Sequence, residues 1–380
     1  MVGTSRDSIR SAVTIVAEWL SALPSTVALE SRSGAYQAAW TAVKALPEPI
    51  AAEVFKRGAD IATRRQGKGV RRLESNLRRV VGPEMSQARL GVLTRDGMRS
   101  YARYWRELFR PQTYDPARIM RDTDLEGWDF FRSLLKDGRP IIFSLSHSGN
   151  WEAAGVWLIG TGVPFTTVAE RLEPESLFQQ FVAFREGLGM EVLPLTGGEA
   201  PPFPVLADRL RSGRSVCLLG DRDLSRRGVE VEFFGATARM PGGPAALAID
   251  TGAILFPPGL SFTRKGWGLH ARTVIEVPAD GTREEKIQQM TQDVARSFEG
   301  FIAENPQDWH MLQRVWLDDL DPRRVAEERA RSAAEAAETA AATQARATET
   351  TQAGEAGEAR EVTEETAELA DEAATELGGH

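Results

Sequence analysis

The chain has 380 residues, of which 42% are apolar, and a formal net charge of −8. This length and apolar content are enough for a large hydrophobic core. The single cysteine, Cys217, excludes a disulfide framework and a cysteine-rich zinc site, and it suits a reducing compartment. The sequence contains no run of about 18 apolar residues, so it predicts no membrane-spanning helix.

The negative charge is concentrated in the C-terminal part of the chain. Residues 332–380 contain twelve Asp and Glu and two Arg, a net charge of −10, which leaves about +2 for residues 1–331. This segment, rich in Ala, Glu and Thr, has no aromatic residue and cannot bury enough apolar surface to offset the entropy lost on ordering. We therefore expect residues 327–380 to form a disordered, acidic tail. The nearly neutral remainder does not favour nucleic-acid binding.

Helical spacing of apolar residues dominates the first 110 residues. We expect residues 1–34 to be a helical extension and residues 35–110 to be a helical, membrane-facing region. The segment 86–110 combines several arginines with the aromatic residues Tyr101, Tyr104, Trp105 and Phe109. Such a helix can lie in a membrane interface. The alternative is an ordinary amphipathic helix whose apolar face packs in the core.

Strand-like apolar runs alternate with helical segments of about 10–15 residues between residues 138 and 317. Strands are predicted at 139–147, 163–171, 190–195, 215–221, 229–234, 253–262 and 268–277. Helices are predicted at 150–162, 174–189, 204–214, 242–252 and 283–306. This alternation predicts an α/β fold with a mainly parallel central sheet flanked by helices.

Polar residues cluster where three predicted strands end. These clusters are residues 147–152, the pair Glu170 and Arg171, and residues 221–223. In open α/β sheets, ligands bind at the carboxyl ends of the strands. If the three strands are neighbours, the clusters share one rim, and we expect the functional site there.

His147 is the strongest candidate for chemistry in the first cluster. An imidazole is suited to general-base catalysis near neutral pH, and it needs a carboxylate to fix its tautomer. Glu152, five residues on, could supply that carboxylate, and so could Asp221 across the sheet edge. Gly149 permits a tight turn, and backbone N–H groups near it could bind an anion or an oxyanion. The alternative is a structural histidine at a strand end.

Two other patterns are less specific. Asp221 and Asp223 could hold a divalent metal with a nucleotide-sugar diphosphate, or they could serve as helix-capping or ion-pairing residues. No cluster of histidines or carboxylates lies near them in the sequence, so no metal site is predicted. His310, within PQDWHMLQRVW, is interpreted as a packing or hydrogen-bonding residue. No G-x-S-x-G nucleophile motif and no P-loop occurs.

An ordered series of motifs resembles a known family. The spacing of His147 and Glu152 is similar to the H-x4-D/E motif of glycerolipid acyltransferases. Further motifs are AER at 169–171, FVAFREGLG at 181–189, LLGDRDL at 218–224, VEVEFFG at 229–235, PGGPA at 241–245 and PQDWHMLQRVW at 306–316. The series resembles the lipid A acyltransferase superfamily and, within it, the actinobacterial phosphatidylinositol mannoside acyltransferases. The resemblance runs from about Ala35 to Leu317.

The resemblance implies an acyl-CoA-dependent O-acyltransferase with a glycerolipid acyltransferase-like domain over residues 35–320. Such enzymes transfer a long-chain acyl group, typically palmitoyl, to a mannose hydroxyl of a phosphatidyl-myo-inositol mannoside. They act as peripheral proteins at the cytoplasmic face of the plasma membrane. The implied partners are acyl-CoA as co-substrate, the mannosylated lipid and an anionic membrane surface, with no cofactor or metal. Three alternatives stay open: another glycolipid or lysophospholipid acceptor, a metal-dependent glycosyltransferase, and a membrane-binding module without turnover.

The resemblance also implies roles for individual residues. His147 is the general base, with no covalent acyl-enzyme, and Asp221 stands where the family has the acidic partner. Glu152 occupies the acidic position of the H-x4 motif. Glu170 and Arg185 match positions that line the groove for the sugar and the acyl chain. We also expect substrate binding by Arg171, Arg222 and Asp223, and stabilisation of an oxyanion near Gly149 or by Arg222.

Overall fold

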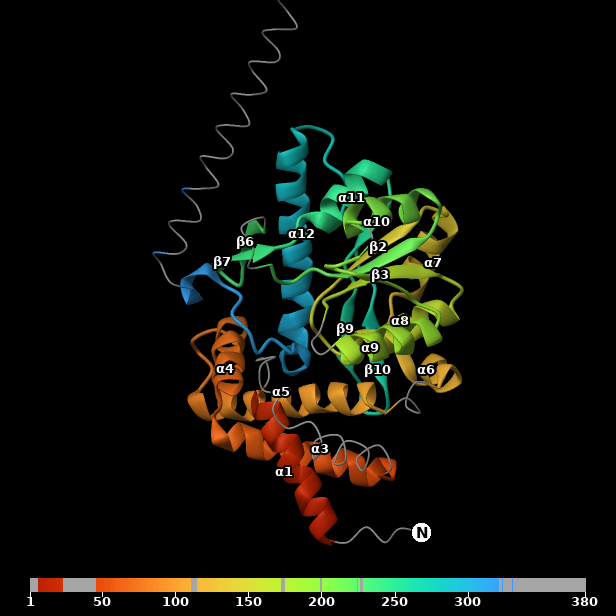
Figure 1. The fold of residues 1–380 in the computed structure, drawn as a ribbon. Helices are drawn as coiled ribbons and strands as arrows, with labels where there is room; N and C mark the ends of the chain where they lie inside the picture. Colours follow the sequence, from red (N-terminus) through yellow and green to blue (C-terminus); the bar gives the residue numbers. More distant parts are fainter. Residues whose placement is uncertain are drawn as a thin grey trace, which may run out of the picture. The chain divides into compact units, whose positions relative to one another are not determined.

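The computed structural model describes residues 6–22, 46–110, 115–171, 175–198, 200–223, 225, 228–320, 323 and 330 (Figure 1). Met1–Asp319 form one unit, and Leu320–His380 form another. The predicted acidic tail, apart from residue 330, lies outside the described residues, as does the segment 23–45. The description below concerns the first unit.

The N-terminal region consists of packed helices, as the sequence predicts. They are α1 (Arg6–Ala22), α3 (Glu48–Arg65), α4 (Lys68–Val81) and α5 (Gln87–Leu108). Pro49 stands in the first turn of α3, where the missing N–H costs nothing, and the side chain of Ser86 caps α5. The apolar faces of the helices share one buried cluster, and α3 packs against both α1 and α5 (Figure 1).

The centre of the unit is a five-stranded parallel sheet in the order β4-β3-β5-β2-β8. Its strands are β2 (Ile141–Leu145), β3 (Phe165–Ala169), β4 (Glu191–Pro194), β5 (Ser215–Leu219) and β8 (Ile254–Phe256). All five residues of β2 are buried, because helices cover both faces of the sheet. The prediction of a mainly parallel central sheet is confirmed.

Different helices cover the two faces of this sheet (Figure 1). On one face lie α7 (Trp128–Asp137) and α8 (Trp151–Gly160), and α6 (Pro116–Asp122) packs on α8. On the other face lie α10 (Pro202–Arg211), α11 (Gly243–Thr251) and α12 (Arg283–Glu304), whose first turn has a capping box of Thr282 and Glu285. The helix α9 (Glu175–Gly187) packs beside β4 at the sheet edge.

The structure departs from the predicted strands at two places. The predicted strand 253–262 is divided between β8 and β9 (Gly259–Phe262), which belong to different sheets, because Pro257 and Pro258 cannot donate ladder hydrogen bonds. The strand β9 pairs with β10 (Trp267–His270), and β10 pairs with β1 (Thr123–Glu126). The predicted strand 268–277 therefore ends early, at His270.

The predicted strand 229–234 is half of a hairpin. The strands β6 (Val229–Phe233) and β7 (Ala236–Met240) pair in antiparallel fashion, and sequence reasoning missed β7. After α12 the chain forms two short 3-10 helices, η4 (Pro306–Asp308) and η5 (Leu317–Asp319). The segment that joins them passes beside the carboxyl ends of the central strands, where it pairs with the loop after β2.

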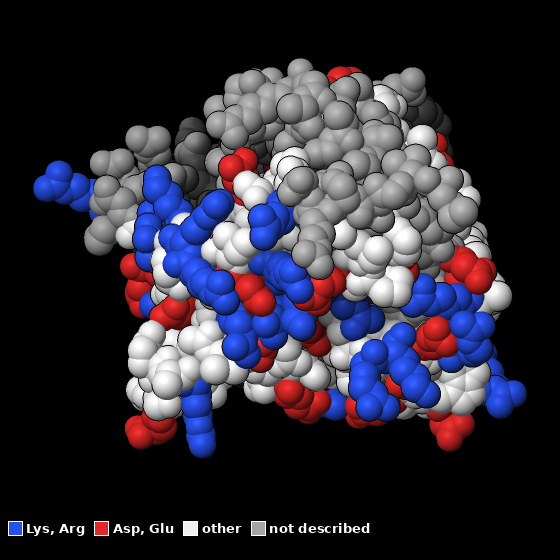
Figure 2. Space-filling model, turned by 90° about the horizontal axis from the view of Figure 1, so that it is seen from below, with Lys and Arg blue, Asp and Glu red and all other residues white. Residues whose placement is uncertain are grey.

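Figure 2 shows the face seen from below the view of Figure 1. Lys and Arg side chains gather on this face among Asp and Glu side chains. Several arginines of α3 and α5 are ion-paired, among them Arg57 with Glu53 and Arg99 with Asp60. Within the described residues, no helix combines the length and the apolar character needed to cross a membrane.

Candidate active site

The register of two parallel strands brings His147 and Asp221 together. Leu145 of β2 pairs with Leu219 of β5, and each chain runs two residues further to reach His147 and Asp221 respectively. The N–H of Gly220 extends the ladder by donating to the carbonyl of Leu145 at 2.7 Å. A Cβ at Gly220 would meet the hydroxyl of Ser144, so a side chain here would force Ser144 to move.

Asp221 is fully buried and accepts three hydrogen bonds. The Nδ1 of His147 donates to Oδ1 at 2.5 Å, and the backbone N–H of His147 donates to Oδ2 at 2.9 Å. The indole N–H of Trp309 also donates to Oδ2, at 3.0 Å. Because an ionised carboxylate only accepts, the proton of a neutral His147 ring is assigned to Nδ1, which leaves the lone pair on Nε2.

The charge on Asp221 is stabilised by these donors. Burial by itself raises the pKa of this carboxyl, but the attraction of His147 and the hydrogen bonds from His147 and Trp309 outweigh burial and hold the pKa below its usual range. Asp221 is therefore a permanent anion at neutral pH. It can stabilise a positive charge on His147 when the ring takes up a proton.

Glu152, the other carboxylate that sequence analysis offers to His147, is engaged elsewhere. Asn150 caps α8, and from the first turn of that helix the buried carboxylate of Glu152 pairs with Arg185 of α9. The Nε of Arg185 lies 3.1 Å from both carboxylate oxygens, and the second guanidinium nitrogen lies 2.5 Å from Oε1. Asp221, not Glu152, is the carboxylate in contact with His147.

Gly149 makes the turn between β2 and α8 possible. Its φ is +57°, and a Cβ there would lie 2.9 Å from the backbone nitrogen of Ser261. The N–H of Gly149 donates to the carbonyl of Asp308 at 2.9 Å. This donor is therefore already used within the protein, and an oxyanion near Gly149 would need another N–H or an arginine.

His147 opens onto a cleft of about 1080 Å³ of empty space, part of it open to solvent. About a third (31%) of its side chain is exposed. Three of the predicted binding residues, Glu170, Arg185 and Arg222, line the same cleft, together with the aromatic residues Tyr101, Tyr104, Trp105, Trp151, Phe178 and Phe181. The carboxyl ends of β2, β3 and β5 thus share one rim.

Two predicted binding residues do not line the cleft. Arg171 pairs with Glu175 and donates to the carbonyl of Gly197. The carboxylate of Asp223 accepts the N–H of Ser225 at 2.8 Å.

Within the described part of the chain, no three His, Cys, Asp or Glu residues are grouped so as to hold a metal ion. Both oxygens of Asp221 face His147 or Trp309, so Asp221 and Asp223 do not form a joint carboxylate site.

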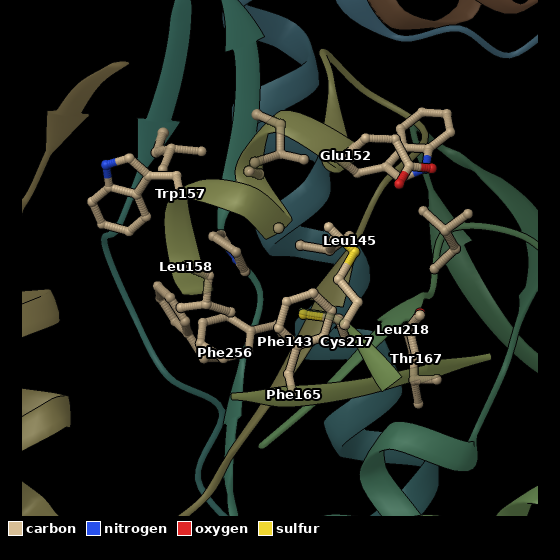
Figure 3. A pocket seen from close by; sticks show the side chains of 18 of the residues that line it. Phe143, Leu145, Glu152, Trp157, Leu158, Phe165, Thr167, Cys217, Leu218 and Phe256 are labelled. Atoms are coloured by element: carbon tan, nitrogen blue, oxygen red, sulfur yellow. The ribbon is translucent and has the colours of Figure 1, made fainter. Parts of the chain in front are cut away.

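An apolar pocket adjoins the cleft between the central sheet and α8 (Figure 3). It encloses about 860 Å³ of empty space, part of it open to solvent. Its walls include Phe143, Leu145, Trp157, Leu158, Phe165, Cys217 and Phe256. Glu152 and Trp157 lie on opposite sides of the pocket in Figure 3. Four residues line both spaces, so the pocket and the cleft are adjacent: Trp151, Val168, Arg185 and Leu219.

Sequence reasoning missed several residues that hold this site. Trp309 contacts Asp221, and the buried carboxylate of Glu107 accepts from the side chain of Asn150, the cap of α8. His310, which the sequence predicts to be a packing or hydrogen-bonding residue, is buried as expected, and its Nε2 lies 2.9 Å from the hydroxyl of Ser100. Burial lowers the pKa of His310 to about 3, so the ring is neutral at physiological pH. Only the aromatic content of residues 306–316 hinted at these contacts.

Comparisons with known proteins agree with this geometry. Residues 28–318 match the profile of the bacterial lipid A biosynthesis acyltransferases. A phosphatidylinositol mannoside acyltransferase of Mycolicibacterium smegmatis is 48% identical over 291 residues, which cover 77% of this chain and 93% of that protein. One from Mycobacterium tuberculosis is 45% identical over 309 residues, covering 81% of this chain and 95% of that protein. The chain therefore belongs to the family of bacterial lipid A biosynthesis acyltransferases.

Proposed function

We propose that the protein transfers a long-chain acyl group, such as palmitoyl, from acyl-CoA to a mannose hydroxyl of a phosphatidyl-myo-inositol mannoside. His147 acts as the general base, and no covalent acyl-enzyme forms. The observation that supports the proposal is that His147, in contact with Asp221, lines a cleft that adjoins an apolar pocket. The names of the relatives from Mycolicibacterium smegmatis and Mycobacterium tuberculosis support the choice of acceptor.

The proposed chemistry follows from the tautomer of His147. Its Nε2 lone pair removes the proton of the mannose hydroxyl while the oxygen attacks the thioester carbonyl. Asp221 stabilises the imidazolium that forms. The tetrahedral oxyanion then collapses, the bond between the carbonyl carbon and sulfur breaks, and CoA leaves as a thiolate that can take the proton from Nε2. The products are the acyl ester and CoA, so no nucleophilic residue is required.

Cys217 supports this direct transfer. It lies within β5 against the apolar pocket, and burial raises the pKa of its thiol well above the usual value. A buried, protonated thiol is a poor nucleophile. We assign it to the wall of the pocket and not to the reaction.

The two adjoining spaces suit the two substrates. We propose that the apolar pocket holds the acyl chain, because its lining is predominantly aliphatic and aromatic, as in ligand sites that bury hydrocarbon. Glu170 and Arg185 in the cleft face the sugar of the acceptor in this proposal. Arg222, beside Asp221 on the cleft wall, is the residue that we propose for the oxyanion or for a substrate phosphate.

We propose further that the protein acts as a peripheral protein on the cytoplasmic face of the plasma membrane. The cleft is walled on one side by Tyr101, Tyr104 and Trp105 of α5, so lipid substrates can enter along aromatic side chains. The face in Figure 2 carries both cationic and anionic side chains. An anionic lipid surface would therefore be bound by selected arginines, not by a uniformly positive face.

The test is transfer of radiolabelled palmitoyl-CoA by the purified protein in the presence of a chelator. Mannosylated phosphatidylinositol, plain phosphatidylinositol, a lysophospholipid and a lipid A precursor are offered separately. The proposal predicts label on the mannosylated lipid only. Label on another acceptor would keep the chemistry and overturn the acceptor. No label on any acceptor, with binding to anionic vesicles intact, would favour a binding module. The family match and the separation of Asp221 from Asp223 disfavour the glycosyltransferase alternative.

A further inference from the structure

Trp309 reaches the catalytic pair from inside the protein. It is fully buried and does not line the cleft, yet its indole N–H donates to Oδ2 of Asp221 at 3.0 Å. The aromatic rings of Phe233 and Trp316 pack against it, with centroids 5.9 and 6.1 Å away. Their packing fixes the direction in which the N–H points.

The backbone around Trp309 is joined to the loop that carries His147. The carbonyl of Asp308 accepts from the N–H of Gly149, and the N–H of His310 donates to the carbonyl of His147 at 2.8 Å. The carboxylate of Asp308 accepts in turn from Ser100 of α5 at 2.6 Å and from the N–H of Phe262 at 2.8 Å. The backbone at Trp309 therefore cannot move away from Asp221 without breaking contacts to α5, β9 and the His147 loop.

A buried carboxylate depends strongly on its donors. Desolvation favours the protonated form of Asp221, and each N–H directed at its oxygens favours the ionised form. The Oδ2 atom has two such donors, the backbone N–H of His147 and the indole of Trp309. The form with an ionised Asp221 and a neutral His147 depends on the indole N–H more than the protonated forms of the pair do. Without that N–H, Asp221 and His147 together therefore bind a proton more tightly.

We propose that Trp309 is a positioning residue for acyl transfer: its indole N–H keeps the Asp221 carboxylate ionised and directed at Nδ1 of His147. This inference rests on the proposed role of His147 as the base. Among the described residues, the titratable and charged groups that line the cleft with His147 are Tyr101, Tyr104, Glu170, Arg185, Arg222 and His310. Substitution of Trp309 changes none of them, so a shift in pH dependence would report on the indole N–H.

The experiment compares Trp309→Phe with a chain in which Trp309 is replaced by benzothienylalanine, an isostere whose sulfur takes the place of the N–H. Trp316→Phe is the matched control, since it keeps an aromatic ring packed against Trp309 but removes an indole N–H that donates to the carbonyl of Phe233 at 2.7 Å and not to Asp221. Two quantities are followed: the pH profile of kcat/KM, and the NMR titration midpoint of the His147 ring. The chain has only four histidines, and His147→Gln assigns the signal.

We expect both Trp309 substitutions to move the acid limb of kcat/KM and the NMR midpoint to higher pH by about one unit, a typical shift for loss of a donor to a buried carboxylate. At neutral pH kcat should fall about tenfold with KM nearly unchanged. Trp316→Phe should move neither quantity. Unchanged midpoints in the Trp309 variants, or equal shifts in all three variants, would overturn the inference. If the wild type transfers no acyl group but its NMR midpoint still depends on Trp309, the proposed function fails while the link between Trp309 and the pair holds.

Discussion

Asp221→Asn separates the orientation of His147 from the rest of the site. The amide of asparagine has one accepting oxygen and one donating nitrogen. Two N–H groups point at the Oδ2 position, so the amide oxygen should remain there and the NH2 group should take the Oδ1 position. The Nδ1 of His147 would then have to accept a hydrogen bond, which moves the ring proton to Nε2, the atom that should act as base.

The magnitudes follow from these contacts. Loss of charge-assisted hydrogen bonds in a buried site should lower the free energy of unfolding by roughly 1–3 kcal/mol. The misplaced proton should lower kcat by about 10²–10⁴, which corresponds to roughly 3–5 kcal/mol of transition-state stabilisation. The substitution is therefore expected to harm catalysis more than folding, with little change in KM.

The assay is the initial rate of palmitoyl transfer to mannosylated phosphatidylinositol, with urea unfolding measured on the same preparations. Asp223→Asn is the matched control, because Asp223 follows the same strand but its carboxylate accepts the N–H of Ser225 and makes no contact with His147 among the described residues. That variant should keep activity within about twofold of the wild type, as expected for a surface turn. Near-wild-type kcat in Asp221→Asn, or equal losses in both variants, would refute the reasoning.

Three further predictions address other parts of the site. Glu152→Gln should lower the free energy of unfolding by about 3 kcal/mol, because it removes the buried carboxylate that pairs with Arg185, but it should lower kcat less than tenfold. Urea unfolding and transfer rates measure the two effects. A loss of kcat as large as that of Asp221→Asn would indicate that Glu152 is the partner of His147. Cys217→Leu should fill part of the apolar pocket and shift the preferred acyl donor to acyl chains shorter by about two methylene units, with a loss of about 1–3 kcal/mol in the free energy of unfolding. Transfer rates with acyl-CoA donors of increasing length test this prediction. An unchanged length preference would mean that the acyl chain binds elsewhere. Burial lowers the pKa of His310 to about 3, from an unfolded-state pKa near 6.5, so its contribution to stability is complete above pH ~6.5 and is lost as the pH falls from there towards 3. Between pH 7.5 and 5 the free energy of unfolding of the wild type should fall by about 2 kcal/mol more than that of His310→Gln. Parallel curves of unfolding free energy against pH for the two proteins would contradict this.

Local sequence patterns predicted the parallel core well. The mainly apolar run of β2 and the mainly apolar, asparagine-capped α8 are strong signals, because a strand covered on both faces and a buried helix both require such residues. The division at Pro257 and Pro258 could have been predicted from the chemistry of proline alone. The strand β7 could not, since Ala236–Met240 contains an arginine and a threonine and is held by pairing with β6.

The site was only partly visible in the sequence. Patterns placed His147, Glu170 and Asp221 at strand ends, but the choice between Glu152 and Asp221 depended on the sheet order, which puts β5 next to β2. The hydrogen bond from Gly149 to Asp308 and the contact of Trp309 with Asp221 both arise because the segment after α12 folds back on the loop after β2. Contacts between such distant parts of the chain leave no periodic signal in a single sequence.

The most direct test of the account is the rate of palmitoyl transfer from palmitoyl-CoA to mannosylated phosphatidylinositol by His147→Gln beside the wild type. Folding of the variant is checked by its urea unfolding curve. The account predicts rapid transfer by the wild type and a rate lower by at least about 10² in the folded variant, since Gln can hydrogen-bond but cannot accept the proton. A folded variant that retains most of the wild-type rate would contradict the assignment of His147 as the general base.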